Sequence, residues 1–259
     1  MGARSTAIGL ATVSRPIPGT SRTPGLHPDM LLTPLRSRRP EILDDPAVDP
    51  TDRLRSIGDV VASNRWLGGR RAALGELRRA LRGLSHATVL DIGTGLADIP
   101  ACARDRAAAE GSVLETIGVD EAEPLLEVAR HRLTHVVRAN ALALPFRTAS
   151  VDIVICSQVL HHFDAAGAAA LLREMHRVAR RVAIVSDLRR SWVAASGFWL
   201  VSFPMRFHRI TRHDGVVSVL RGFTADELRQ LIAEATGCKA VVRRRLGFRL
   251  TARWRPRAA

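Results

Sequence analysis

The chain has 259 residues, 46% of them hydrophobic, which is enough for one complete α/β domain with an extension. Its formal net charge of +14 comes almost entirely from arginine, so it indicates compositional bias as much as a surface selected for nucleic acid. The cysteines are far apart, without disulfide or metal-ligand spacing, and no apolar run is long enough to span a bilayer, so we expect a metal-free cytoplasmic protein.

The amino-terminal part of the chain is rich in proline, serine, threonine and arginine and has no periodicity. We therefore predict that residues 1–50 are a disordered or leader extension. Met30 is a candidate start, with a dispensable leader before it. An organelle transit peptide is the alternative, because acids are scarce before Glu41.

A helical pattern starts at Thr51, a candidate N-cap, and continues in apolar residues at three- and four-residue spacing. The glycine pair at 68–69 interrupts it, and a second helical pattern follows. We predict that residues 51–85 form a helical cover ahead of the first strand. The Asn-Arg-Trp run at 64–66 either walls a ligand site or, through Trp66, belongs to a helix–loop–helix core.

The central motif, at residues 88–100, is an apolar strand, a turn with two glycines and the start of a helix. Gly93 and Gly95 let a ligand approach the main chain, which predicts a nucleotide-type ligand at the end of a parallel strand. Asp98 stands where a dinucleotide-binding fingerprint has its third glycine, and with Asp91 it would repel a pyrophosphate. S-adenosylmethionine carries an ammonium and a sulfonium and no phosphate, so the acids favour it.

Further strands follow in alternation with helical patterns. The second apolar strand ends in Asp120, whose carboxylate suits the two ribose hydroxyls, and the third precedes Asn140-Ala141. The fourth strand runs from Val151 to Cys156 and is followed by Ser157, and the fifth ends at Asp187. This alternation predicts a doubly wound, mostly parallel α/β sheet, with ligand residues gathered at the carboxyl ends of the strands.

The regular pattern lapses between residues 188 and 222, where an apolar and aromatic stretch, 191–205, is flanked by arginines. We predict a cap insertion here, which closes an apolar substrate pocket, packs as ordinary core, or contacts a membrane peripherally. Thr224 and Glu227 have the spacing of a capping box. The chain ends in two alternating strand patterns around Gly247, which predicts an antiparallel hairpin within the 86–259 core.

Together these segments resemble the successive motifs of class I S-adenosylmethionine-dependent methyltransferases. The likeness is carried by Asp91-x-Gly93-x-Gly95-x-Ala97, Gly118-Val119-Asp120, the run from Asn140 to Phe146, and Val151-Asp152-Ile153-Val154. It implies a Rossmann-like seven-stranded sheet and S-adenosylmethionine as cofactor. The residues that it implies for cofactor binding are Asp91, Gly93, Thr94, Gly95, Asp98, Asp120, Asn140, Ala141 and Ser157.

One of these positions departs from the family. Where relatives usually have an aspartate that holds the adenine amino group, this chain has Asn140. An asparagine can still offer its side-chain carbonyl to that donor, so we expect a modest loss of affinity and retained binding.

From about Arg38 onward the chain more specifically resembles small-molecule methyltransferases of bacterial quinone and aromatic-polyketide pathways. The segments that carry this likeness are 64–69, 160–163, 187–191 and 211–215. It implies methylation of a hydroxyl or ring carbon on a lipophilic phenol, polyketide or quinone precursor. The signature of enzymes that methylate exocyclic amines of bases is absent, since Cys156-Ser157-Gln158-Val159 occupies its place.

An oxygen nucleophile must lose its proton, and histidine is the natural base near neutral pH. His161 and His162 follow the fourth strand, and His213 stands beside Asp214 in the predicted cap. We predict His162 and His213 as the catalytic residues. The alternatives are that one of the paired histidines is structural and that the His213-Asp214 pair only closes a turn.

Two other functions stay open. An RNA or protein methyltransferase is supported by the basic residues after Gly237, which otherwise form a solvated strand face and tail. No specific nucleic acid is expected, because there is no tyrosine and no module with stacking aromatics. The second alternative is a non-catalytic module that binds the cofactor without turnover.

Overall fold

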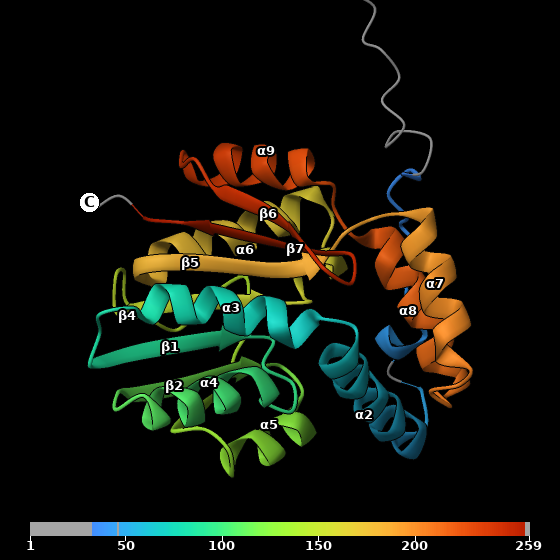
Figure 1. Ribbon diagram of the computed structural model, residues 1–259, viewed down its shortest axis with the longest axis horizontal. Helices are drawn as coiled ribbons and strands as arrows, with labels where there is room; N and C mark the ends of the chain where they lie inside the picture. The colour runs from blue at the N-terminus through green and yellow to red at the C-terminus, as the bar shows by residue number, and fades with distance from the viewer. Residues whose placement is uncertain (1–32, 46, 257–259) are drawn as a thin grey trace, which may run out of the picture.

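The computed structural model describes residues 33–45 and 47–256, which form a seven-stranded sheet in the order β3-β2-β1-β4-β5-β7-β6 (Figure 1). Five strands run parallel, and β7 lies antiparallel between β5 and β6. The predicted doubly wound sheet with a carboxyl-terminal hairpin is therefore confirmed. The strands are β1 (His86–Ile92), β2 (Val113–Asp120), β3 (His135–Arg138), β4 (Val151–Ser157), β5 (Ala179–Leu188), β6 (Val241–Arg245) and β7 (Arg249–Trp254).

Helices cover both faces of the sheet because the central strands are apolar on both sides. Within β4, Ile153 and Ile155 pack with α3 and α4, whereas Val154 and Cys156 point to the opposite face, toward α6 and α9. This alternation builds two cores, one on each face of the sheet. The covering helices are α3 (Gly69–Leu81), α4 (Asp98–Ala109), α5 (Glu123–Arg130), α6 (Ala165–Val178) and α9 (Ala225–Thr236).

The remaining helices gather beyond the carboxyl ends of the parallel strands (Figure 1). They are α2 (Pro50–Trp66), α7 (Trp192–Ser202), α8 (Arg209–Arg221) and the short 3-10 turns η1 (Ile42–Asp44) and η2 (Leu160–His162). The stretch 188–222 is thus mostly helical, although its sequence shows no regular pattern. The pattern is missing because α7 is apolar on all sides and has no amphipathic period. No helix formed by the described residues is long and apolar enough to cross a membrane.

The segment before α2 differs from the prediction for residues 1–50. From residue 33 the chain packs against α8 and η2, where the Arg36 guanidinium donates to the carbonyls of Arg221 and Phe163 at 2.8 and 2.9 Å. Side-chain contacts hold this strap without any periodic pattern, so the prediction of disorder is wrong for its described part. Residues 1–32, with the expected leader before Met30, lie outside the described residues.

Helix α2 begins one residue earlier than its predicted cap. The Asp49 carboxylate accepts the amide hydrogens of Thr51 and Asp52 at 2.8 and 3.3 Å, and Pro50 occupies the first turn. Asp49 is therefore the N-cap in place of Thr51. The capping box of Thr224 and Glu227 at the start of α9 is confirmed.

The hairpin turn between β6 and β7 packs on the junction of α2 and α3, and we expect this contact to be sensitive to a single methyl group. Gly247 has φ +73°, and a Cβ there would lie 2.0 Å from the Leu67 carbonyl oxygen. Gly111 has φ +76° with no atom within 4 Å of the added carbon. Gly111→Ala should cost about 1–2 kcal/mol of unfolding free energy for its left-handed backbone. Gly247→Ala should cost about 1–3 kcal/mol more because of overpacking.

Urea unfolding of both glycine variants measures this difference. Equal losses of unfolding free energy would mean that the hairpin can move away from Leu67 without cost, and that its position is not fixed by this contact.

Candidate active site

The glycine turn after β1 is closed by the neighbouring strand. The amides of Gly93 and Thr94 both donate to the Val119 carbonyl, at 2.8 and 3.0 Å. The Gly95 amide donates to Asp120 Oδ2 at 3.0 Å. The Asp120 carboxylate at the end of β2 is therefore fixed against the turn, with its position set before any ligand binds.

The same turn holds carboxylates whose bonding capacity is unfilled. Asp91 Oδ2 accepts the Thr94 hydroxyl at 3.0 Å, while Asp91 Oδ1 and Asp98 Oδ2 are buried and have no hydrogen-bond partner among the described residues. Burial, with the negative charges of Asp98 and Asp120, raises the pKa of Asp91 to about 8. Burial also raises the pKa of Asp98, against the opposing charges of two arginines. A cationic ligand that brings hydrogen-bond donors would satisfy these groups.

The other predicted cofactor residues lie at the ends of β3 and β4. Ser157 Oγ is buried and finds no hydrogen-bond partner within residues 33–45 and 47–256, so it is another group that a ligand would satisfy. Asn140 is exposed, and its side-chain oxygen accepts the Leu142 amide at 2.7 Å. Ala141, which follows it, is half-buried. The fold thus brings all the predicted cofactor positions to the carboxyl ends of neighbouring parallel strands.

A cavity of about 580 Å³ extends from the Asp120 side of this edge under α7 and α8. Gln158, His161, His162 and Arg249 contribute its polar lining together with acids of the η1 segment. Its apolar walls come mainly from the surrounding helices, through Ile57, Val60, Leu67, Leu125, Val193, Phe198, Val201 and Val219. A lipophilic molecule with few polar groups fits such a lining.

His161, which lines this cavity, forms a buried pair with Asp187 behind it, with exposed fractions of 2% and 1%. Asp187 Oδ1 lies 2.7 Å from His161 Nδ1, and its two oxygens also accept the amides of His161 and Leu188. Burial opposes ionisation, but the His161 charge and these hydrogen bonds lower the pKa of Asp187 overall. An ionised Asp187 places the ring proton on Nδ1, which leaves Nε2 as the acceptor.

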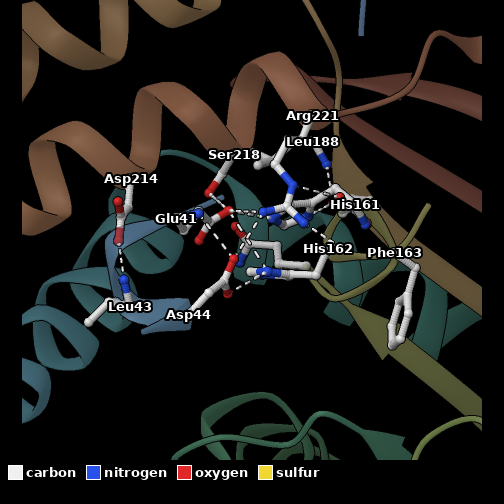
Figure 2. Close-up of polar contacts among 12 residues, drawn as sticks. Glu41, Leu43, Asp44, His161, His162, Phe163, Leu188, Asp214, Ser218 and Arg221 are labelled. Carbon is white, nitrogen blue, oxygen red and sulfur yellow. Dashed lines mark hydrogen bonds and ion pairs between the residues drawn. The ribbon is translucent and has the colours of Figure 1, made fainter. Parts of the chain in front are cut away.

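Figure 2 shows Glu41, just before η1, and Asp44, the last residue of η1, facing the two histidines and Arg221. Glu41 Oε1 lies 3.7 Å from His161 Nε2 and 3.8 Å from His162 Nδ1, and it accepts the Ser218 hydroxyl at 2.7 Å. Burial lowers the pKa of His162, but Asp44 and Glu41 outweigh it, and the pKa is raised overall. The cluster is therefore built to hold and exchange protons.

Glu41, His161 and His162 also offer ligand atoms within 4.8 Å of one another, as a metal site would require. The histidine rings, however, are stacked in a tilted arrangement, with centroids 4.3 Å apart and planes 33° apart, and His161 Nδ1 is already paired with Asp187. The Arg221 guanidinium also lies 3.9 Å from the same Glu41 oxygen. This geometry suits a proton relay better than a metal ion.

The structure does not bring the two predicted catalytic histidines together. The His213 side chain is 52% exposed and lines a separate outer pocket, whereas His162 lines the inner cavity. His213 Nδ1 lies 2.8 Å from Asp214 Oδ1, and that carboxylate also accepts the amides of Ile42 and Leu43. Through these two hydrogen bonds the Asp214 carboxylate anchors η1, and with it Glu41.

Sequence reasoning missed two groups that line this cavity, the Glu41 carboxylate and the Arg249 guanidinium, and also the Asp187 partner of His161. The histidine pair was a visible signal, but the partners come from distant segments. Trp66 is 68% exposed, so it neither walls the cavity nor belongs to a core, and both predicted roles are wrong. Asn64 is buried and contacts Gln158, which lines the cavity.

Comparison with known proteins identifies the segment that holds the glycine turn. Residues 90–185 match the family described as a methyltransferase domain. The chain carries a class I S-adenosylmethionine-dependent methyltransferase domain. The unpartnered acceptors of Asp91, Asp98 and Ser157 fit that cofactor, whose donors and positive charge they could bind. The methyltransferase domain thus contains the glycine turn and the strand ends that carry most of the predicted cofactor residues.

Curated relatives of this methyltransferase domain differ in what they act on. The UbiE ubiquinone/menaquinone biosynthesis C-methyltransferase of Stenotrophomonas maltophilia is 37% identical over 117 residues, which cover 40% of this chain and 44% of that protein. The human probable tRNA methyltransferase 9B is 27% identical over 144 residues, covering 56% of this chain and 28% of that protein. The matches therefore span less than half the length of these relatives.

Solved structures share the fold at low identity. A methyltransferase from Aquifex aeolicus aligns with a TM-score of 0.56 at 16% identity, covering 81% of this chain and 99% of that one. An O-methyltransferase family 2 protein from Planctomyces limnophilus, in complex with apigenin, aligns with a TM-score of 0.58 at 18% identity, covering 82% and 63%. These likenesses show the fold of the methyltransferase domain.

Proposed function

We propose that the protein transfers a methyl group from S-adenosylmethionine to a hydroxyl or ring carbon of a lipophilic phenol, polyketide or quinone precursor. The observation that carries this proposal is the apolar cavity that joins Asp120 to the His161–Asp187 pair. Asp120, a predicted cofactor residue, and His161, the buried base, both line this cavity. The likeness to a quinone C-methyltransferase agrees with this acceptor class.

The bound cofactor supplies an electrophilic methyl group, and the chain's own side chains prepare the acceptor for it. His161 Nε2 takes the proton from the acceptor oxygen or ring carbon, while Asp187 stabilises the imidazolium that forms. The walls of α2, α7 and α8 position the acceptor and exclude water. Ser218 and Arg221 hold Glu41 beside His161, where it can receive the proton next.

A nucleic-acid substrate has weaker support. Of the basic residues after Gly237, Arg245 is paired with buried Glu76 and Arg249 is buried in the cavity. These two cations are not available to a phosphate backbone on the surface. The likeness to a tRNA methyltransferase covers 28% of that protein, and the cavity walls are mainly apolar.

The test is incubation with methyl-labelled cofactor and a panel of alkylated phenols, quinols and bulk RNA. We expect the label in the lipophilic phenols or quinols. Labelled RNA or protein would replace the proposal by the corresponding alternative. Normal binding of S-adenosylhomocysteine with no labelled product from any acceptor class would favour a non-catalytic module.

We also propose that the outer face of α7 rests on an anionic lipid surface, from which a lipophilic acceptor enters. Trp192, Trp199, Leu200 and Phe203 are exposed apolar residues on or next to this helix. Trp192 and Trp199 line a pocket of about 990 Å³, and none of the described residues that line it is an aspartate or glutamate. Its cations are Arg36, Arg39, Arg209 and Arg212. Apolar side chains ringed by arginines complement an anionic headgroup layer.

Vesicle flotation tests this contact. Phosphatidylglycerol vesicles should bind the protein more strongly than phosphatidylcholine vesicles, and Leu200→Ser should weaken binding by about tenfold, from the lost burial of one apolar side chain. Val113, exposed at the amino end of β2, supplies the matched control Val113→Ser, which should bind normally. Equal binding by the two variants, or a dimer in solution that Leu200→Ser dissociates, would contradict the lipid contact.

A further inference from the structure

Arg249 is a buried cation that the proposed methyl transfer does not use. It begins β7, is 3% exposed and lines the inner cavity. Its Nη1 donates to Gln158 Oε1 at 2.5 Å, while its Nε is buried and has no hydrogen-bond partner in the part of the chain that the structure describes. In the ranges 33–45 and 47–256 it forms no ion pair, whereas buried Arg190 is paired with Glu227 at 2.5 Å.

The nearby carboxylate of Asp187 does not neutralise this guanidinium by direct contact. Both Asp187 oxygens already accept hydrogen bonds from His161 and Leu188. Burial lowers the pKa of Arg249 to about 10, partly offset by the Asp187 charge, so the guanidinium is still protonated at neutral pH. A protonated group with no anion beside it is costly to bury, and a bound anion would remove most of that cost.

The surroundings of Arg249 orient it. Gln158 has a left-handed backbone with φ +56°, which is uncommon for a residue other than glycine. Its side-chain Nε2 donates to Asn64 Oδ1. A Cβ at Gly69 would lie 2.6 Å from Asn64 Oδ1 and 3.3 Å from Arg249 Cζ. Gln158 and Gly69 therefore flank the guanidinium, Asn64 holds the Gln158 side chain, and the strained glutamine fixes one donor edge of the guanidinium.

We propose that Arg249, oriented by Gln158 and Asn64, is the receptor for a carboxylate bound in this cavity. A planar guanidinium with a free Nε edge matches the two oxygens of a carboxylate. The inference rests on the proposed function, which offers two sources of that group. One is the amino-acid part of the cofactor, and the other is an acidic acceptor.

Binding measurements distinguish the two sources without any turnover. Calorimetry with S-adenosylhomocysteine and with 5′-methylthioadenosine, which lacks the amino-acid part, tests the cofactor. If the cofactor supplies the carboxylate, Arg249→Met should weaken S-adenosylhomocysteine at least about tenfold and leave methylthioadenosine unchanged. If the acceptor supplies it, Arg249→Met should instead abolish the preference for an alkylated hydroxybenzoate over its methyl ester, measured by thermal shift with S-adenosylhomocysteine present.

Stability separates this role from a merely structural one. Arg249→Met removes an unneutralised buried charge at similar volume, so the midpoint of thermal unfolding without ligand should stay or rise. Arg190→Met is the matched control, because it removes a buried guanidinium that is paired with a half-exposed glutamate, and it should lower that midpoint without changing the ligand preference. Partial recovery of affinity by Arg249→Lys is also expected.

The inference is overturned if Arg249→Met leaves both the S-adenosylhomocysteine affinity and the acid-over-ester preference unchanged. Neither measurement depends on product formation. A failed carboxylate receptor and a failed methyl transfer can therefore be told apart.

Discussion

Replacing His161 by alanine is expected to lower kcat for a hydroxyl acceptor by about 10²–10⁴-fold, the usual contribution of a positioned general base. Affinity for S-adenosylhomocysteine should not change, because His161 is hydrogen-bonded to Asp187 and not to any predicted cofactor residue. The reason is the geometry of its ring: Asp187, 2.7 Å from Nδ1, leaves Nε2 free to accept the proton. Single-turnover kinetics with labelled cofactor measure the chemical step directly.

The partner carboxylate gives a second test of the same base. Asp187→Asn keeps the side-chain shape but removes the negative charge that fixes the ring proton on Nδ1 and stabilises the imidazolium. Turnover should fall in the same direction as for the alanine variant.

Two other histidines are matched controls. His162→Ala should have a smaller effect, because His162 lies at the edge of the cavity beside Asp44. His213→Ala should leave kcat unchanged, because its side chain lines the outer pocket. Retained turnover in His161→Ala, together with loss in His213→Ala, would show that the base was assigned to the wrong histidine.

Much of the fold follows from local sequence patterns. The apolar strands β1, β2, β4 and β5 alternate with helices, and the Thr224 capping box marks the start of α9. Helix α7 could not be predicted as regular, because a helix that is apolar all round has no amphipathic period. Asp49 was missed as a cap since two candidates, Asp49 and Thr51, stand close together.

The site was predictable where its residues sit in one motif. Asp91, Gly95 and Asp98 share the glycine turn, and Asp120 follows the adjacent strand, so parallel pairing alone brings them together. The proton-handling cluster joins residues far apart in sequence, and Glu41 comes from a strap without periodicity. Arg249 stood among many basic residues that looked solvated, and only tertiary packing buries it.

Affinity for S-adenosylhomocysteine is expected to rise with pH between pH 6 and pH 8, by up to about tenfold per pH unit. In the ligand-free protein burial raises the pKa of Asp91 to about 8, so the carboxyl is almost wholly protonated at pH 6. The positive amino group of the ligand favours the ionised carboxylate and lowers that pKa. Binding below pH 8 must therefore expel about one proton, and it becomes easier as the pH rises.

Calorimetry in two buffers of different ionisation enthalpy counts the released proton, and Asp91→Asn should remove both the proton release and the pH slope.

The stability of the ligand-free protein should fall as the pH rises, opposite to the affinity for the ligand. A carboxyl whose pKa is raised on folding contributes stability below its unfolded pKa of 3.8, and this is lost as the pH rises toward 8. The ligand should therefore raise the unfolding midpoint more at pH 8 than at pH 6. A dissociation constant independent of pH, with no proton released, would mean that Asp91 stays neutral when the ligand binds, and the cationic group would then have to be held by Asp98 or Asp120.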